Sequence, residues 1–428
     1  MNSGAGARAA STALALGLLL LPLPGRAHFP ALYGKDFVIA QPSSPVVVPI
    51  ASPAPMNDSD ADAYRQQVEG LELEGGPYAP NLAEPLTDLA RYYRDREDYR
   101  EALALYERAL HLVRVNDGLY SERQIPLVRD LLDLYRSVGD REGLDDRYNY
   151  FFRLYGSGQP PFTALRRRAS MEYMRWQREA HMSDPTGSSY RRLVDLYQLN
   201  KRMLESLEQL PEVDPVWRHQ LVINQIRNLY LLLGIDAIAE DGFGSAPMAS
   251  SGTPDAVSYV RQRVVAIQRT GYAVGRNLLQ DLISQSGHLG PVELAALHLE
   301  LGDWLQWNEL LPRADKQYAE VEKILQQAGE LVLLEQWLGA PVELPANNAF
   351  WLAEWSPEGT LPAVVTVHFD ISAKGRLSNI EADPLAPENV HAGRRIKRML
   401  KNTHFRPRFA QGQAQAAEEV TRRYRLVE

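Results

Sequence analysis

The residues best suited to chemistry lie near the C-terminus, in the stretch THFRPRFAQG (residues 403–412). Two arginines alternate there with two phenylalanines about Pro407. Arginine beside aromatic side chains can bind a peptide or nucleic acid, because guanidinium groups donate charged hydrogen bonds and stack on rings. The same spacing fits a plain strand, in which Phe405 and Phe409 face a packed helix while Arg406 and Arg408 face solvent. The plain strand is favoured, a partner surface stays open, and nucleic acid is disfavoured.

Other reactive groups are scattered along the chain. None of the nine histidines shares metal-ligand spacing with another on a helix face. The acid pairs Glu72/Glu74 and Asp145/Asp146 are interpreted as solvated charges, since a catalytic dyad needs a buried cleft. The chain contains no P-loop, GxSxG, HExxH or glycine-rich dinucleotide turn. We therefore predict no catalytic residue, no cofactor and no metal, and keep an enzyme of unknown class as an alternative.

The composition is that of a soluble globular protein with two or three domains. The chain has 428 residues, of which 45% are hydrophobic and 23% charged. It contains no cysteine, which excludes disulfides, thiolate zinc sites, cysteine nucleophiles and a cysteine-linked lipid anchor.

The first 27 residues have the pattern of a cleavable export signal. Arg8 precedes the apolar run Ala13–Leu21, and small residues at Gly25 and Ala27 suit a signal peptidase. No later segment approaches the length of an apolar transmembrane helix. We predict a periplasmic protein, with an uncleaved anchor as the alternative. Cleavage after Ala27 would leave an N-terminal His28, which can chelate copper, although no second histidine partner is evident.

Residues 28–80 are expected to form a proline-rich linker or extended arm. Five prolines lie between residues 42 and 55, and no helical period survives between residues 34 and 62. The run Val46–Val48 is a weak candidate for an added edge strand, because prolines flank it.

Residues 81–329 show the apolar spacing of paired helices. Small and large residues alternate from Leu86 to Ala109, and the same frame returns 42 residues later, from Val128 to Phe151. This spacing resembles tetratricopeptide repeats, with Ala83–Asn116 as the best unit. The tyrosines at positions 93, 106, 135 and 148 are then mostly core residues. Further helices are predicted over 163–182, 188–209, 215–233, 257–285, 291–305 and 313–328.

A connector over residues 330–359, with a short helix over 331–338, leads to a different pattern. Residues 365–371 alternate as a half-buried strand, 377–382 form its hairpin partner, 388–402 an amphipathic helix and 420–427 a last strand. The segments FDISAKGRLSNI and FRPRFAQG resemble the TonB C-terminal domain, and this module covers residues 360–428. The predicted fold is mostly α with a small α+β C-terminal domain: an irregular TPR-like α-solenoid followed by a strand-strand-helix-strand-strand TonB-like module.

Charge divides the chain into an acidic body and a basic module. Residues 360–428 hold twelve Lys and Arg against seven Asp and Glu, which is a net charge of +5. The whole chain has a net charge of −8, so residues 1–359 have a net charge of −13. The module is expected either to dock on the body or to meet an anionic partner. The candidate partner-binding residues are Arg406, Arg408, Arg423 and Arg425.

These patterns favour a non-enzymatic periplasmic scaffold. It would bind a protein or peptide of the cell envelope through the helical groove, the TonB-like sheet edge, or both. The alternative that the TonB resemblance implies is an energy transducer contacting outer-membrane transporters. A cleavable signal and a helical body in place of a long spacer argue against that alternative.

Overall fold

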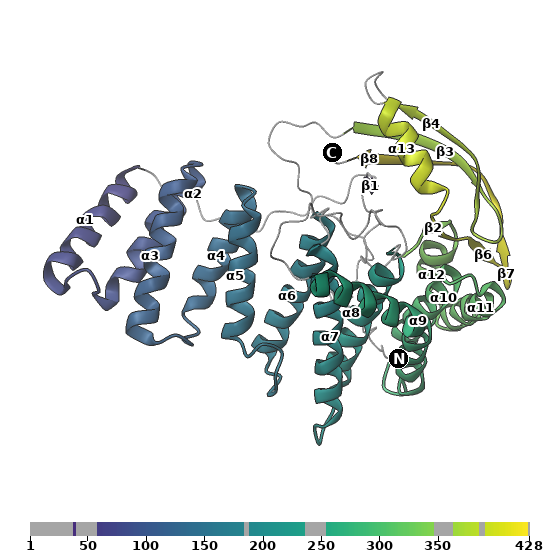
Figure 1. Ribbon diagram of the computed structural model, residues 1–428, viewed down its shortest axis with the longest axis horizontal. Coiled ribbons are helices and arrows are strands. Elements are labelled where there is room, and N and C mark those ends of the chain that lie inside the picture. Colours follow the sequence, from purple (N-terminus) through teal and green to yellow (C-terminus); the bar gives the residue numbers. More distant parts are fainter. Residues whose placement is uncertain are drawn as a thin grey trace, which may run out of the picture.

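The computed structural model describes residues 37–39, 58–183, 188–235, 254–345, 363–384 and 390–426. The predicted signal (1–27), Val46–Val48 and most of the loop 241–254 lie outside these residues. The described chain is mostly helical, with a small strand region at its C-terminal end (Figure 1).

Helices α1 to α12 form the helical body, and consecutive helices pack on one another (Figure 1). Their bounds are α1 Asp58–Gly75, α2 Ala83–Asp95, α3 Tyr99–Asp117, α4 Gln124–Ser137, α5 Arg141–Leu154, α6 Ala164–Ser183, α7 Ser188–Glu208, α8 Pro215–Leu233, α9 Pro254–Ser284, α10 Pro291–Trp307, α11 Leu311–Gln327 and α12 Leu331–Leu338. We call α2, α4, α6, α8 and α10 the A helices, and α1, α3, α5, α7, α9 and α11 the B helices.

Aspartates cap the second helix of each of the first two pairs. Asp98 accepts a hydrogen bond from the Glu101 N–H (3.4 Å) at the start of α3. Asp140 accepts one from the Gly143 N–H (2.9 Å) at the start of α5. Each carboxylate satisfies a backbone donor that the helix leaves unpaired, which explains why these turns recur.

Asp214 makes the most complete of these caps. One of its carboxylate oxygens accepts from the N–H groups of Val216 (2.9 Å) and Trp217 (3.0 Å), and the other pairs with Arg167. Asp214→Ala is expected to lower the free energy of unfolding by about 1–2 kcal/mol, measured by chemical denaturation. Glu212→Ala, at an exposed position two residues earlier, is the control and should change it by less than about 0.5 kcal/mol. Equal losses in the two variants would argue against the cap.

Helix α1 lies where an extended arm was expected. Its buried or half-buried residues Ala61, Tyr64, Val68 and Leu71 recur at helical spacing and pack on the first helix pair. Acidic residues at its N-terminal end complement the helix dipole. The proline-rich stretch therefore ends before residue 56, whereas the arm was predicted to extend to residue 80. The helical body begins at Asp58.

Two apolar cores run through the helical body. The first lies among α1 to α6 around the fully buried Tyr106 and Phe151, and the second lies among α5 to α12 around Trp217, Tyr230 and Trp304. Of the four tyrosines expected to be mostly core residues, Tyr106 and Tyr135 are buried, whereas Tyr93 and Tyr148 are half-buried.

The β module is built on a four-stranded antiparallel sheet with the order β1-β8-β3-β4. Its elements are β1 Phe37–Ile39, β3 Ala363–Ile371, β4 Leu377–Pro384, α13 Val390–Leu400 and β8 Ala417–Leu426. Helix α13 packs on β4, β3 and β8, and covers the face that carries the buried residues of β3. Strand β1 comes from the N-terminal arm and covers the edge of β8.

The stretch THFRPRFAQG (residues 403–412) is divided at Pro407. Strand β5 (Phe405–Arg406) pairs with β2 (Val342–Glu343), and β6 (Arg408–Ala410) pairs with β7 (Gln413–Gln415). Proline has no N–H to donate, so pairing stops there and the chain changes partner. Phe405 packs in the module core against Phe369, as expected, but Phe409 packs in the core of the helical body. The expectation that both rings face one helix is therefore wrong for Phe409.

Candidate functional site

The four predicted partner-binding arginines occupy different environments. Arg408 and Arg423 are exposed, on β6 and β8 respectively. Arg425 lies on β8 opposite Val38, and its side chain is outside the described residues. Arg406 is only 4% exposed, so the expectation of a solvent-facing side chain is wrong for this residue. The arginines do not form one exposed cluster.

Arg406 instead joins the β module to the helical body. Its Nη1 lies 2.9 Å from Oδ1 and 2.7 Å from Oδ2 of Asp303 on α10. The hydroxyl of Tyr318 on α11 donates to the same Oδ1 at 3.0 Å. The side chains of the ion pair are 4% and 6% exposed. Burial raises the pKa of Asp303, and the guanidinium and the hydroxyl oppose that shift.

Polar contacts close the junction beside this ion pair. The amide of Gln306 on α10 donates to the carbonyls of Lys374 (2.9 Å) and Phe405 (3.0 Å). Gly375 turns the β3–β4 hairpin at a φ of +72°, and a Cβ there would lie 1.9 Å from the Phe405 oxygen, so only glycine fits.

Acidic groups of α11 and its neighbouring turn hold the basic module at two further points. Glu322 accepts hydrogen bonds from the N–H groups of Gln411 (2.9 Å) and Gly412 (2.8 Å) in the β6–β7 turn. Arg376 forms an ion pair with Glu309. The acidic body and the basic module therefore dock on each other in this structure, in accord with their opposite net charges.

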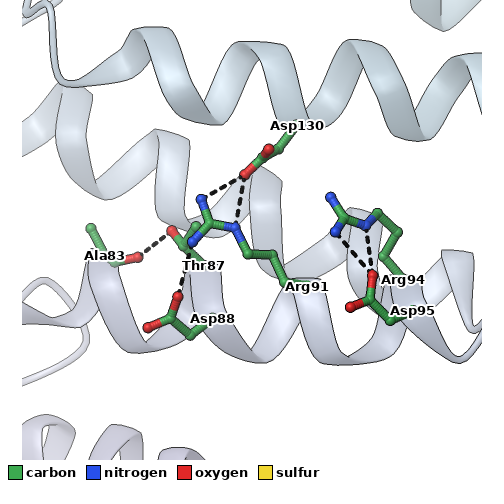
Figure 2. A network of polar contacts seen from close by, with 7 residues as sticks. All are labelled: Ala83, Thr87, Asp88, Arg91, Arg94, Asp95 and Asp130. Atoms are coloured by element: carbon green, nitrogen blue, oxygen red, sulfur yellow. Dashed lines mark hydrogen bonds and ion pairs between the residues drawn. The ribbon is translucent and has the colours of Figure 1, made fainter. Parts of the chain in front are cut away.

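A series of ion pairs connects successive A helices. Arg91 on α2 binds Asp130 on α4 through Nε (3.3 Å) and Nη2 (3.1 Å), and it also binds Asp88 on its own helix (3.0 Å); Figure 2 shows this arrangement. One step further, Arg136 on α4 pairs with Glu179 on α6. We call this series the A ladder; in each pair the arginine lies on the earlier helix.

The B helices carry a second series with the opposite direction, which we call the B ladder. Arg108 on α3 pairs with Glu72 on α1, and Arg147 on α5 with Glu107 on α3. Arg192 on α7 binds Asp145 on α5 at 2.7 Å. Here the arginine lies on the later helix. Glu72 and Asp145, interpreted from the sequence as solvated acids, therefore tie neighbouring helix pairs together.

The ladders have a signal in the sequence, which is the separation between the paired residues. The A-ladder partners are 39 and 43 residues apart, close to the 42-residue shift at which the apolar frame returns. Arginines and acids separated by one repeat are therefore candidates for such pairs. Which of them meet depends on side-chain direction, which apolar spacing leaves undetermined.

Buried Glu343 gives the junction a pH dependence. Burial raises the pKa of Glu343 from 4.5 to about 7, while the Tyr424 hydroxyl, 3.1 Å from its Oε2, and nearby Arg422 act in the opposite direction. Between these two pKa values the folded protein holds the proton more tightly than the unfolded chain does. Stability is therefore lost as the pH rises through that window, by about 3 kcal/mol for this one group.

Glu343→Gln is expected to abolish that loss. The measurement is the difference in unfolding free energy between wild type and variant at about pH 4.5 and at about pH 8. The control Glu381→Gln changes an exposed carboxylate on β4 and should keep the wild-type pH dependence. Parallel pH profiles for wild type and Glu343→Gln would contradict the assignment.

Two kinds of feature are absent from the part of the chain that the structure describes. No group of three or more His, Asp or Glu side chains there is arranged to hold a metal ion. None of the described helices combines the length and the apolar character needed to cross a membrane.

Comparisons with known proteins leave the family open. No family model and no curated protein matches the chain. Among solved structures, BtubC (BKLC) from P. vanneervenii aligns with a TM-score of 0.32 and 14% identity, over 63% of this chain and 90% of that one. A circular tandem repeat protein with novel repeat topology aligns with a TM-score of 0.30 and 15% identity, over 65% and 68%. Similarities this low carry no argument about function.

Proposed function

We propose that this chain is a non-enzymatic scaffold of the cell envelope, which binds a protein or peptide through the face formed by its A helices. The A ladder is the observation that carries the proposal. Its arginines Arg91 and Arg136 are 41% and 33% exposed, so they keep donors available to a ligand. Repeated helix pairs offer an extended surface because each unit contributes the same positions. The pair of Arg91 with Asp130 is partly exposed, and pairs of this kind contribute only about 0–1 kcal/mol, so Arg91 can exchange its partner for a ligand's charge readily.

The finer assignments belong to the same proposal. We infer that the helical body is TPR-like, that the β module is TonB-like, and that an N-terminal signal exports the chain to the periplasm. The residue patterns support these inferences: the 42-residue recurrence, the FDISAKGRLSNI and FRPRFAQG segments, and the apolar run before Ala27.

The two ladders provide matched variants for testing the binding face. Arg129 on α4 also belongs to the A face, where its Nη2 lies 3.7 Å from Oε1 of Glu172 on α6. Arg91→Glu with Arg129→Glu changes the A face, and Arg108→Glu with Arg147→Glu changes the B face by the same chemistry. After cross-linking in cells, we expect the A-face variant to lose its partners at least about 10-fold and the B-face variant to keep them. Equal capture by both variants, at equal protein levels, would argue against the A face.

N-terminal sequencing of the mature chain tests the location. A start at His28 in the periplasmic fraction supports export with cleavage. A retained Met1, with an outer-membrane transporter captured through the β module alone, would favour the energy transducer over the scaffold.

A further inference from the structure

The step from α6 to α8 departs from the pattern of the A ladder. Arg178 on α6 meets two amide oxygens there instead of a carboxylate: its Nη2 lies 2.8 Å from Oδ1 of Asn224, and its Nη1 lies 3.1 Å from Oδ1 of Asn228. Among the described residues, no carboxylate lies within ion-pair distance of Arg178. The A ladder therefore has an arginine at this step without its acid.

The position of Arg178 makes the missing acid significant. The residue is only 7% exposed, and a buried charge without a counter-ion is unfavourable. Burial and the positive charges of Arg227 on α8 and Arg175 lower the pKa of Arg178. Glu300 on α10 adds a negative charge near Arg227. The Nε of Arg227 is itself a buried donor with no hydrogen-bond acceptor in the described structure.

We propose that Arg178 and Arg227 bind the side-chain carboxylate of an aspartate or glutamate from the partner, which supplies the missing acid of the A ladder. This inference rests on the proposed scaffold function. Side-chain carboxylates fill the matching position at Asp130 and Glu179, so this face already accepts that group. A guanidinium has five N–H donors, and Arg178 uses two of them on amides. Arg227 is half-buried and Arg178 is 7% exposed, so the partner's carboxylate would reach Arg178 from the side of Arg227.

Three blocked tripeptides test the chemistry on the purified full chain. Acetyl-Ala-Glu-Ala-amide carries a side-chain carboxylate, acetyl-Ala-Gln-Ala-amide carries none, and acetyl-Ala-Gln-Ala with a free C-terminus carries a main-chain carboxylate. Binding is measured by ligand-observed NMR. We expect the glutamate peptide to bind at least about 10-fold more tightly than the neutral one. Equal binding of the glutamate and neutral peptides, or preference for the free C-terminus, overturns the proposal.

Two variants assign the binding to this site. Arg178→Met should reduce glutamate-peptide binding at least about 10-fold, whereas Arg313→Met, at an exposed position on α11, should leave it unchanged. Asn228→Asp replaces the amide oxygen 3.1 Å from Arg178 with a carboxylate oxygen, so the chain supplies its own acid. That variant should lose peptide binding and unfold at a higher temperature than wild type. Unchanged peptide binding in either site variant overturns the proposal. If Arg178→Met fails to fold, the result for Asn228→Asp decides.

The peptide experiment and the cross-linking experiment fail independently. Loss of carboxylate binding with persistent A-face cross-links would refute the carboxylate site and leave the scaffold function standing. Retained carboxylate binding without A-face cross-links would refute the scaffold function.

Discussion

Replacing Arg406 with methionine is expected to lower the free energy of unfolding by about 3–5 kcal/mol and to release the β module from the helical body. The variant leaves the carboxylate of Asp303 buried without its counter-ion, since the two side chains are 4% and 6% exposed. Chemical denaturation measures the loss. Faster proteolysis between residues 346 and 362, which connect the two parts, reports the release.

The double variant Asp303→Asn with Arg406→Met is the control for this prediction. It removes both charges and keeps an acceptor for the Tyr318 hydroxyl. Removing a whole buried ion pair changes stability far less than breaking it, so the double variant should recover most of the loss. If both variants lose the same free energy, the ion pair is not the cause.

Phe409→Ala is expected to destabilise the helical body by about 3–5 kcal/mol, although the residue belongs to the β module. Its ring is 2% exposed and lies 5.7 Å from the ring of Tyr318 on α11, inside the second core of the body. Removing it leaves a cavity in that core. Hydrogen exchange should therefore quicken in α11.

Phe405→Ala is the matched comparison for Phe409→Ala. Its ring packs against Phe369 in the module core, so exchange should quicken in β3 and α13 instead. Arg408→Ala, between them and exposed, should change stability by less than about 0.5 kcal/mol. The same exchange pattern in both phenylalanine variants would contradict the division of this stretch between two cores.

The contacts of Arg406 and Phe409 with the helical body also determine what a deletion of the β module would do. Deleting residues 360–428 removes the partner of Asp303 and the ring of Phe409 together, so the remaining helical body loses core contacts. Lost binding after such a deletion would not separate the module's own contacts from damage to the body. Point variants on exposed residues keep the two effects apart.

Most helices could be predicted from the sequence, because each buries one face at regular spacing. Helix α8 matches its predicted range, 215–233, and α12 matches 331–338. Helix α1 was missed because a proline-rich stretch precedes it and acidic residues recur within it, while its few apolar residues gain their burial from α2 and α3. Local pattern cannot show burial that a neighbouring helix provides.

The candidate site was harder to predict than the helices. Alternation correctly placed Phe405 in the module core, but it placed Arg406 toward solvent, because alternation assumes that one face of a strand is free. Here a second structure, the helical body, covers that face and supplies Asp303. The A ladder depends on which side chains of successive helices meet, and that follows from packing geometry rather than from spacing alone.

The pairing of β1 with β8 has a mechanical consequence. The strands are antiparallel, with Phe37 opposite Leu426 and Ile39 opposite Tyr424, so both ends of the chain leave this pair on the same side. Tension applied between the two ends would load the Phe37–Leu426 contact first and separate the strands one residue pair at a time. Such unzipping would uncover the backbone edge of β8 while β3 still holds its other side and the helical body bears no load.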